Sequence, residues 1–366
     1  MAAGKIMKRI QGHPIGISDK INRIDGIANE ISWFSSGRSC SSRQEFQKLV
    51  FAVSRIHRIS AASLLLPMLF LAGCLSVLAE PDGNATIRAP AGGSEIVIKT
   101  TARTAGAIDS LTWNGREFIN SHDHGRQLQS ASNLDAGSPI TGETYNPTEA
   151  GSRRDGHGTN TTSRLLFLQA KSNELQTVTK MAFWLAPGEK SGPNLAKNTT
   201  ILSQHLLKKH VVIGYKNLPH VIAYDVTFPL PWGEQHAHAV FEALTGYMPP
   251  EFAQFFMFNP QTGDLEPLSD GPGELPQPIV FTTPDGAHAM GIYAPPQPAP
   301  HVTGPTYGRW RFTAAKVVKW NCVFRLNQEQ GLTPGDYAFR MFVAVGDRDT
   351  VRDSLRALCR EFEGTK

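Results

Sequence analysis

The chain has 366 residues, of which 19% are charged, and its formal net charge is only +4. No concentrated basic segment of the kind that follows a nucleic-acid backbone is present, so we predict no nucleic-acid partner. The length allows two domains, but single all-β domains of about 200–250 residues are common, and one large domain is the simpler prediction.

A charge-free stretch from Ile59 to Ala79 follows a basic segment that contains Lys48, Arg55 and Arg58. A basic region followed by an apolar one is typical of a secretory signal. We therefore predict that residues 51–79 are a signal peptide or lipoprotein signal and that the protein is exported, to the periplasm, the outer membrane or the medium. A membrane anchor is the alternative, because about 20 apolar residues can span a bilayer.

Two endings fit this signal. Leu71-Ala72-Gly73-Cys74 resembles a bacterial lipobox, in which Cys74 would carry the lipid and form the protein's contact with a membrane. Val77-Leu78-Ala79 before Glu80 fits the small-residue cleavage pattern. Residues 1–50 lack a sustained hydrophobic period and precede the signal, so we predict a dispensable leader or a start codon placed too far upstream.

Residues 80–366 are predicted to form a single all-β domain, a large antiparallel β-sandwich. In Ala338–Val345 the apolar residues Phe339, Met341, Val343 and Val345 alternate with the others, which indicates one buried strand face. Pro-Asp-Gly and Pro-Gly-Asp turns separate the strands, as in antiparallel sheets. The predicted strands are Glu95–Lys99, Ile108–Trp113, Ser163–Ala170, Leu175–Trp184, Thr200–Tyr215, Val221–Phe228, His236–Tyr247, Ile279–Thr283, Ala287–Tyr293, Arg309–Leu326 and Tyr337–Val345.

One amphipathic helix is predicted at the C-terminal end. Asp349 or Thr350 can cap its start, and Gly364 is placed where it should stop. Its apolar face comprises Val351, Leu355, Leu358 and Phe362. Cys322 in a predicted strand and Cys359 in this helix are expected either to pair or to remain two separate buried thiols.

The polar segment from Trp113 to Gly158 carries the densest group of side chains that can do acid–base chemistry or bind a polar ligand. Because it lies between predicted strands and is too polar for a core, we predict a long functional loop on a β scaffold. Chemistry at a sugar's ring or glycosidic oxygen needs one group that gives a proton and one that accepts it. We predict His122 or His124 as the acid and Glu143 or Glu149 as the base.

Other side chains are predicted to bind the substrate. Arg126 and Arg153 can hold a carboxylate or hydroxyl group bidentately, as a uronic acid would require. Tyr145 in the loop and Trp310 beside a later turn offer aromatic faces for stacking under a sugar ring. The remaining predicted contacts in the loop are Asp123, Gln127 and Asn146. The alternative is a structural role, in which Asp123, Arg126 and Glu149 form an ion network that fixes the loop.

Two His-x-His pairs, His122–His124 and His236–His238, suggest a second kind of chemistry. Residues i and i+2 of a strand share a face, so each pair can present two imidazoles to an ion such as zinc. We predict no cofactor, and a metal ion at these pairs is the alternative. We retain His236 and His238 as predicted substrate contacts, because a neighbouring strand can bring them to the same cleft; a solvated strand face is the other interpretation.

The segment Gly106–Phe118 with its Asn114-Gly115 turn, the strand-rich middle and the late Pro334-Gly335-Asp336-Tyr337 strand resemble the galactose-mutarotase-like supersandwich superfamily. The resemblance covers about residues 94–346. It implies a carbohydrate ligand, because the superfamily includes aldose epimerases, glycoside hydrolase domains and polysaccharide lyase domains. The epimerases use a histidine acid and a late glutamate base. Here Glu329 lies in a predicted turn and Glu361 and Glu363 lie in the predicted helix, which departs from a simple mutarotase.

Together these features predict an exported carbohydrate-active protein that acts on or binds a saccharide, neutral or acidic, through the polar loop. As an enzyme it would be of the glycoside hydrolase, polysaccharide lyase or sugar epimerase type. As a non-enzyme it would be a carbohydrate-binding protein or an envelope scaffold. The sequence does not predict an oligomeric state.

Overall fold

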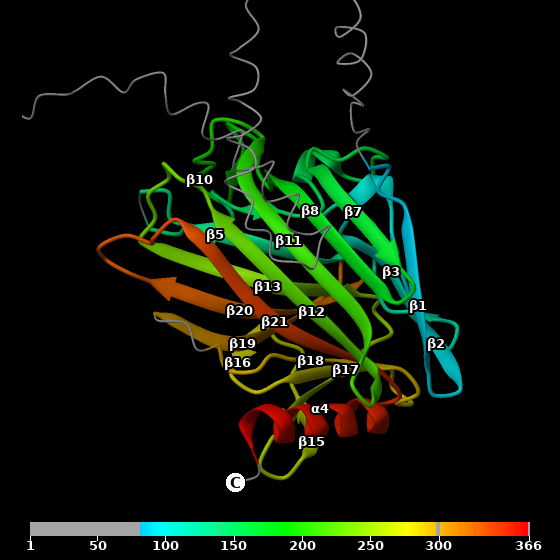
Figure 1. Ribbon diagram of the computed structural model, residues 1–366. Helices are drawn as coiled ribbons and strands as arrows, with labels where there is room; N and C mark the ends of the chain where they lie inside the picture. Colours follow the sequence, from blue (N-terminus) through cyan, green and yellow to red (C-terminus); the bar gives the residue numbers. More distant parts are fainter. Residues whose placement is uncertain (1–80, 138, 298–300, 365–366) are drawn as a thin grey trace, which may run out of the picture. The chain divides into compact units, whose positions relative to one another are not determined.

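The computed structural model describes residues 81–137, 139–297 and 301–364, which fold into two facing layers of antiparallel strands (Figure 1). The first, here called the β13 layer, pairs its strands in the order β16 (Gly273–Leu275), β19 (Val302–Phe312), β20 (Val317–Asn327), β13 (His238–Met248), β5 (Leu128–Leu134), β3 (Ile108–Trp113), β2 (Ser94–Thr100) and β1 (Ala85–Ala91). The two-residue strand β4 (Arg116–Glu117) turns back and pairs antiparallel with the end of β3.

The second, here called the β12 layer, has the order β7 (Arg164–Lys171), β8 (Glu174–Phe183), β11 (Leu202–Tyr215), β12 (Leu218–Leu230), β21 (Gly335–Gly346), β18 (Ala289–Tyr293), β17 (Ile279–Thr282), β14 (Gln254–Asn259) and β15 (Asp264–Leu268). Strand β6 (Pro147–Thr148) pairs with both β5 and β8 and so joins the layers at one edge. Short elements lie in the connections: β9 (Lys190–Ser191), β10 (Asn194–Leu195), and the 3₁₀ turns η3 (Ala102–Thr104) and η4 (Arg153–Asp155).

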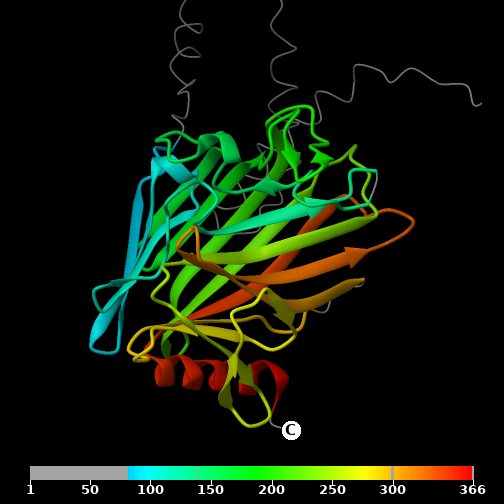
Figure 2. The ribbon, with the colours of Figure 1, turned by 180° about the vertical axis from the view of Figure 1, so that it is seen from behind.

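The main core fills the space between the layers, whose strands cross steeply in Figures 1 and 2. Strand alternation sends every second side chain into this space. The rings of Phe324 on β20 and Phe339 on β21 have centroids 4.5 Å apart, and those of Phe228 on β12 and Phe241 on β13 are 4.9 Å apart. Burying one such side chain contributes about 1.5–3 kcal/mol, so these contacts hold the layers together. The predicted all-β sandwich is confirmed.

The predicted C-terminal helix is α4 (Arg348–Glu363). Its N-cap is Asp347, whose side chain accepts a 2.7 Å hydrogen bond from the backbone N–H of Thr350, and it ends before Gly364. The buried residues Val351, Leu355 and Leu358 pack in a second core cluster on β12, β18 and β21. The helix thus packs against one end of the β12 layer, next to β18 and β21 (Figure 1).

The range Arg309–Leu326, predicted as one strand, is a hairpin of β19 and β20. Residues 313–316 form its turn, where Lys316 has φ 49°. This segment (Thr313-Ala314-Ala315-Lys316) has neither glycine nor proline, so the usual turn signals are missing. Strands β1, β5, β14, β15 and β16 were also not predicted. Strand β5 lies inside the segment from Trp113 to Gly158, which we predicted to be one long loop, because its sequence LQSASNL is mostly small and polar and lacks apolar alternation.

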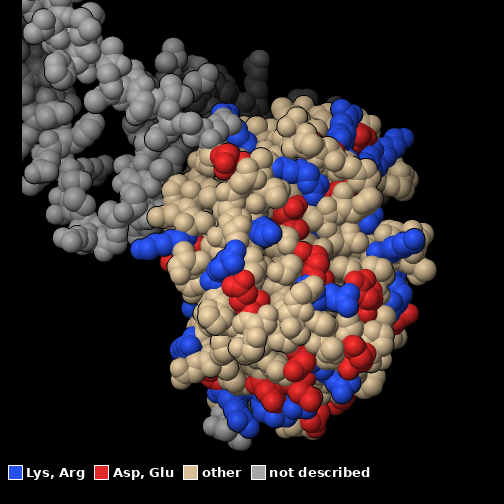
Figure 3. All heavy atoms as spheres, turned by 90° about the vertical axis from the view of Figure 1, so that its right-hand side faces the viewer, with Lys and Arg blue, Asp and Glu red and all other residues tan. Residues whose placement is uncertain are grey.

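Cys322 and Cys359 are both buried and free, which agrees with two separate thiols. No helix among the described residues is long and apolar enough to cross a membrane. The predicted leader, the signal, Cys74 and Glu80 lie outside the described residues. On the face drawn in Figure 3, acidic and basic side chains are intermixed.

Candidate functional site

A cleft opens on the outer face of the β13 layer. Because side chains alternate along β20, Trp320 and Cys322 enter the core while Lys319 points outward, and Glu242 and Tyr247 on β13 reach the same outer side. Loop residues that follow β5 and β8 form the rim. The cleft is shallow, with a cavity volume of ≈ 80 Å³, and is lined by Gly125, Gln129, Ala131, Asn133, Glu143, Asn146, Thr148, Trp184, Glu242, Thr245, Tyr247 and Lys319.

An ion pair lies on the floor of this cleft. The Nζ of Lys319 is 3.2 Å from the Oε2 of Glu242, which also accepts a 2.8 Å hydrogen bond from the hydroxyl of Thr245. Burial alone would raise the pKa of Glu242, but the charge of Lys319 and these hydrogen bonds outweigh it and hold the pKa below its usual value. Burial would lower the pKa of Lys319, and the charges of Glu242 and Tyr247 raise it instead. Both groups are therefore ionised at neutral pH.

A second carboxyl group in the cleft behaves in the opposite way. The pKa of Glu143 is raised, chiefly because cavity residues desolvate its carboxyl group, although the residue as a whole is exposed. The negative charge of Glu242 adds to the increase, and the positive charge of Lys319 works against it. Two carboxyl groups whose pKa values move apart can serve as proton donor and ionised partner.

Aromatic and amide groups complete the cleft. The amide of Asn146 donates a 2.6 Å hydrogen bond to the carbonyl of Ser132, which fixes the rim to β5. Among the described residues, the buried Oδ1 of Asn133 accepts no hydrogen bond. The indole of Trp184 reaches the cleft because residue 125 is glycine: a Cβ there would lie 2.8 Å from the ring. The cleft therefore combines an aromatic face, amides and carboxyl groups, which are typical of sites that bind polar ligands.

Three of the predicted site residues belong to this cleft. Glu143 and Asn146 line it directly. The ring of Trp310 lies beside it, with its centroid 5.0 Å from the Nζ of Lys319.

The predicted catalytic residues other than Glu143 lie elsewhere. Glu149 is fully buried and pairs with the equally buried Nζ of Lys209, so it cannot meet a substrate. His124 is buried, and its two ring nitrogens lie 2.9 Å and 2.8 Å from the carbonyl oxygens of Gly156 and Arg103. His122 packs against the ring of His157 at 4.1 Å.

Most of the predicted binding residues in the loop hold the loop itself. Asp123 and Arg126 pair at 3.0 Å, and Arg126 also donates to the carbonyl of Ala315. The alternative prediction was that Asp123, Arg126 and Glu149 form one ion network that fixes the loop. The contacts of Asp123 and Arg126 agree with it, but Glu149 pairs with Lys209 instead. The amide of Gln127 donates to Ser121 and to the backbone of Asp123. Arg153 pairs with Glu189 at 3.3 Å and donates to the carbonyl of Lys190.

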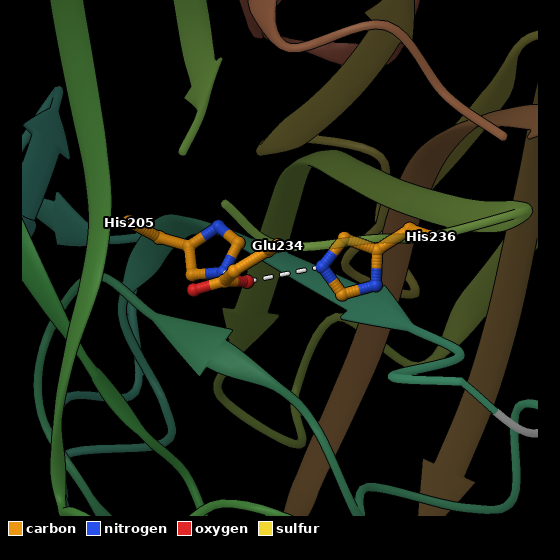
Figure 4. Close-up of side chains that lie close together, drawn as sticks. All are labelled: His205, Glu234 and His236. Atoms are coloured by element: carbon orange, nitrogen blue, oxygen red, sulfur yellow. Dashed lines mark hydrogen bonds and ion pairs between the residues drawn. The ribbon is translucent and has the colours of Figure 1, made fainter. Parts of the chain in front are cut away.

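Tyr145 and His236 meet at a second place, around Glu234. Figure 4 shows Glu234 with His236. His205 on β11 joins them there. His238 begins β13 and lines the adjoining hollow, but it does not belong to the group of ligand atoms around Glu234. The two His-x-His pairs do not come together among the described residues, because each imidazole of the first pair is engaged by its own loop.

The sequence contained signals for the residues that we did not predict. Glu242 and Lys319 are charged residues inside long apolar strands, HAVFEALTGYM and VVKWNCVFRLN. A charge in such a strand must reach solvent, a partner or a ligand.

No protein-family model and no curated protein matches the chain. Solved structures do resemble it. A galactose mutarotase-like protein from Lactobacillus casei has 13% sequence identity and a TM-score of 0.36, and the match covers 72% of this chain and 100% of that one. An α-mannosidase from Enterococcus faecalis has 10% identity and a TM-score of 0.45, with 77% of this chain and 31% of that one covered, and a mutant heparan sulfate lyase from Pedobacter heparinus has 11% identity and a TM-score of 0.37, with 73% and 35% covered. The chain thus spans about a third of the mannosidase and of the lyase.

A galactose mutarotase-like protein is thus among the structures that the chain resembles, and the other two described here are an α-mannosidase and a heparan sulfate lyase. At identities and TM-scores this low, the function of this chain has to come from its own residues.

Proposed function

We propose that the protein binds a saccharide in the cleft on the outer face of the β13 layer. The observation that carries this proposal is the combination of an indole face with amide and carboxyl groups in one open hollow. A sugar ring has an apolar face that stacks on an aromatic ring and a rim of hydroxyls that pair with amides and carboxylates. Trp184 supplies the first, and Gln129, Asn133, Asn146 and Glu242 supply the second.

The charge balance of the cleft favours a neutral saccharide. Glu242 and Lys319 compensate each other, and the raised pKa of Glu143 reduces its negative charge. Arg126 and Arg153, which would serve an acidic sugar, are held by other partners outside the cleft lining. A uronic acid would therefore find no unpaired cation among the residues that line this cleft.

A second candidate function is hydrolysis of a glycosidic bond, which the opposed pKa values of Glu143 and Glu242 favour. Glu143 would give its proton to the leaving glycosidic oxygen as the C–O bond breaks. A water molecule would add to the sugar carbon and give its proton to the ionised Glu242. The products would be two saccharides with free hydroxyls, and the enzyme would regain its starting state when the proton returns to Glu143.

The test is a thermal-shift screen of the full chain with neutral and uronic oligosaccharides, followed by measurements of turnover on every hit. We expect a neutral saccharide to raise the melting temperature of the wild type but not that of Asn133→Ala. Arg154→Ala is the matched control, since Arg154 is exposed and pairs with Glu189 away from the cleft. If the saccharide raises the melting temperatures of Asn133→Ala and wild type equally, its binding site is not this cleft. If only uronic sugars raise the melting temperature, the preference for a neutral saccharide is contradicted.

We also propose that the protein is exported. The charge-free stretch from Ile59 to Ala79, which follows a basic segment, supports this proposal. Mass spectrometry of the native protein tests this. An N-terminus at Glu80, or a diacylglycerol mass on Cys74, supports export, whereas an intact residue 1–79 segment contradicts it.

A further inference from the structure

A compact cluster of potential metal ligands lies apart from the cleft lining (Figure 4). The Nε2 of His205 and the Nε2 of His236 are 2.9 Å and 3.0 Å from the same Oε2 of Glu234. The three donor atoms all lie within 4.8 Å of one another, and both histidines are buried. His205 comes from β11, while Glu234 and His236 come from the β12–β13 connection, so the fold assembles the cluster from separate segments.

The other side of His236 is fixed by Asp135. The Nδ1 of His236 is 3.2 Å from the Oδ1 of Asp135, and the Oδ2 accepts hydrogen bonds from the backbone N–H groups of Ala237 and His238. The backbone N–H of Ala136 also donates to this Nδ1, at 3.3 Å. These contacts hold the ring so that its Nε2 faces Glu234.

Both imidazole Nε2 atoms therefore face one carboxylate oxygen, a contact in which either a proton or a shared cation lies between nitrogen and oxygen. A carboxylate that binds the far nitrogen of a ligating histidine is also the usual outer support of a metal site. The hydroxyl of Tyr145 also donates a 3.0 Å hydrogen bond to the Oε2 of Glu234.

We propose that His205, Glu234 and His236 bind one divalent transition-metal ion, with zinc as the reference ion. Ligands at about 2.0–2.2 Å in a tetrahedron are separated by about 3.3 Å. The two nitrogen–oxygen contacts are close to this value, and the two imidazole nitrogens lie within 4.8 Å of each other, so moderate side-chain shifts suffice. Two imidazoles and one carboxylate suit zinc and its neighbours rather than calcium or magnesium.

The fourth position has room. Glu234 and His236 form part of the wall of an open hollow of ≈ 860 Å³, which also reaches His238 and Gly331. A solvent molecule can therefore complete the coordination. The metal site is also connected to the cleft through the chain, because Tyr145 lies between Asn146 and Thr144 in the rim loop that carries Glu143. The proposal itself does not depend on a saccharide ligand.

The test uses the full chain, stripped of metal with a chelator and titrated with zinc chloride in a calorimeter, followed by cobalt substitution to record the visible bands of a tetrahedral site. We expect one ion per chain for the wild type. Glu234→Gln and His205→Ala should each weaken binding by at least about 100-fold, and Asp135→Asn by about 10–100-fold.

His210→Ala is the matched control, because His210 also faces a carboxylate, Glu174 at 2.8 Å, but without a third ligand. It should bind zinc like the wild type. Glu234→Gln keeps the size of the side chain and its hydrogen-bonding capacity, and circular dichroism will confirm its fold. The proposal is overturned if the wild type takes up no stoichiometric zinc, or if a folded Glu234→Gln binds it equally well.

Discussion

Two lysine–glutamate pairs illustrate how position decides the role of a charge. Lys209 and Glu149 have no exposed side-chain surface, and they are further bonded to the carbonyl of Gly106 and the N–H of Ser130. Lys319 and Glu242 retain 15% and 20% of their side-chain surface and form the floor of a cleft. The enclosed pair can only support the fold, whereas the open pair can also meet a ligand.

The largest effect is expected from Lys209→Met. Removing one partner leaves the carboxylate of Glu149 buried without its counter-charge, which costs about 3–5 kcal/mol. Urea denaturation measures this loss. The double variant Lys209→Met with Glu149→Leu should recover most of it, because two apolar groups leave no charge uncompensated. A loss of under about 1 kcal/mol for the single variant would mean that the pair is hydrated.

A smaller loss of stability but a clear loss of binding is expected from Lys319→Met. Water can reach Glu242 after the change, so the free energy of unfolding should fall by only about 1–2 kcal/mol. Saccharide affinity should fall by at least about tenfold, because the floor of the cleft gains an uncompensated negative charge. Urea denaturation measures the loss of stability and calorimetric titration the loss of affinity. Unchanged affinity would contradict a role for the Lys319–Glu242 pair in binding.

If the protein is a hydrolase, the pH profile of Glu143→Gln should differ from that of the wild type. The proton donor acts in its protonated form, so turnover falls as the pH rises through the raised pKa of Glu143. The alkaline limb of the wild-type profile should therefore lie above the usual range of a glutamate and should vanish in the variant, together with most turnover. Measurement of kcat/KM from pH 4 to about 9 tests this. Persistence of that limb in Glu143→Gln would assign it to another group.

The smallest effect on binding is expected from the polar loop. Arg126→Ala combined with Arg153→Ala removes two ion pairs that hold the loop, Asp123–Arg126 and Arg153–Glu189. Because these pairs are partly or largely solvated, the melting temperature should fall modestly and saccharide affinity should change by less than about twofold. A selective loss of affinity for acidic sugars would instead show that Arg126 and Arg153 contact the ligand.

The fold could be predicted because strand alternation, turn residues and helix periodicity are local properties of a sequence. The site could be predicted only in part, because its residues converge from β5, β13, β20 and the rim loop. The place of Glu143 and Asn146 in a polar loop predicted two residues that line the cleft. The sequence did not point to Glu242 and Lys319, because their exposure depends on which strand face stays uncovered, and it did not predict the burial of Glu149, because Lys209, 60 residues away, determines its surroundings.

The claim that the cleft binds a saccharide is tested most directly by two tryptophans. Trp184 lines the cleft, whereas Trp232 is 78% exposed and does not line it. Calorimetric titration of the strongest saccharide from the screen should show affinity reduced by at least about tenfold in Trp184→Ala, since stacking on the indole is lost, and unchanged affinity in Trp232→Ala. Equal affinities in wild type and Trp184→Ala, or a loss confined to Trp232→Ala, would contradict the account.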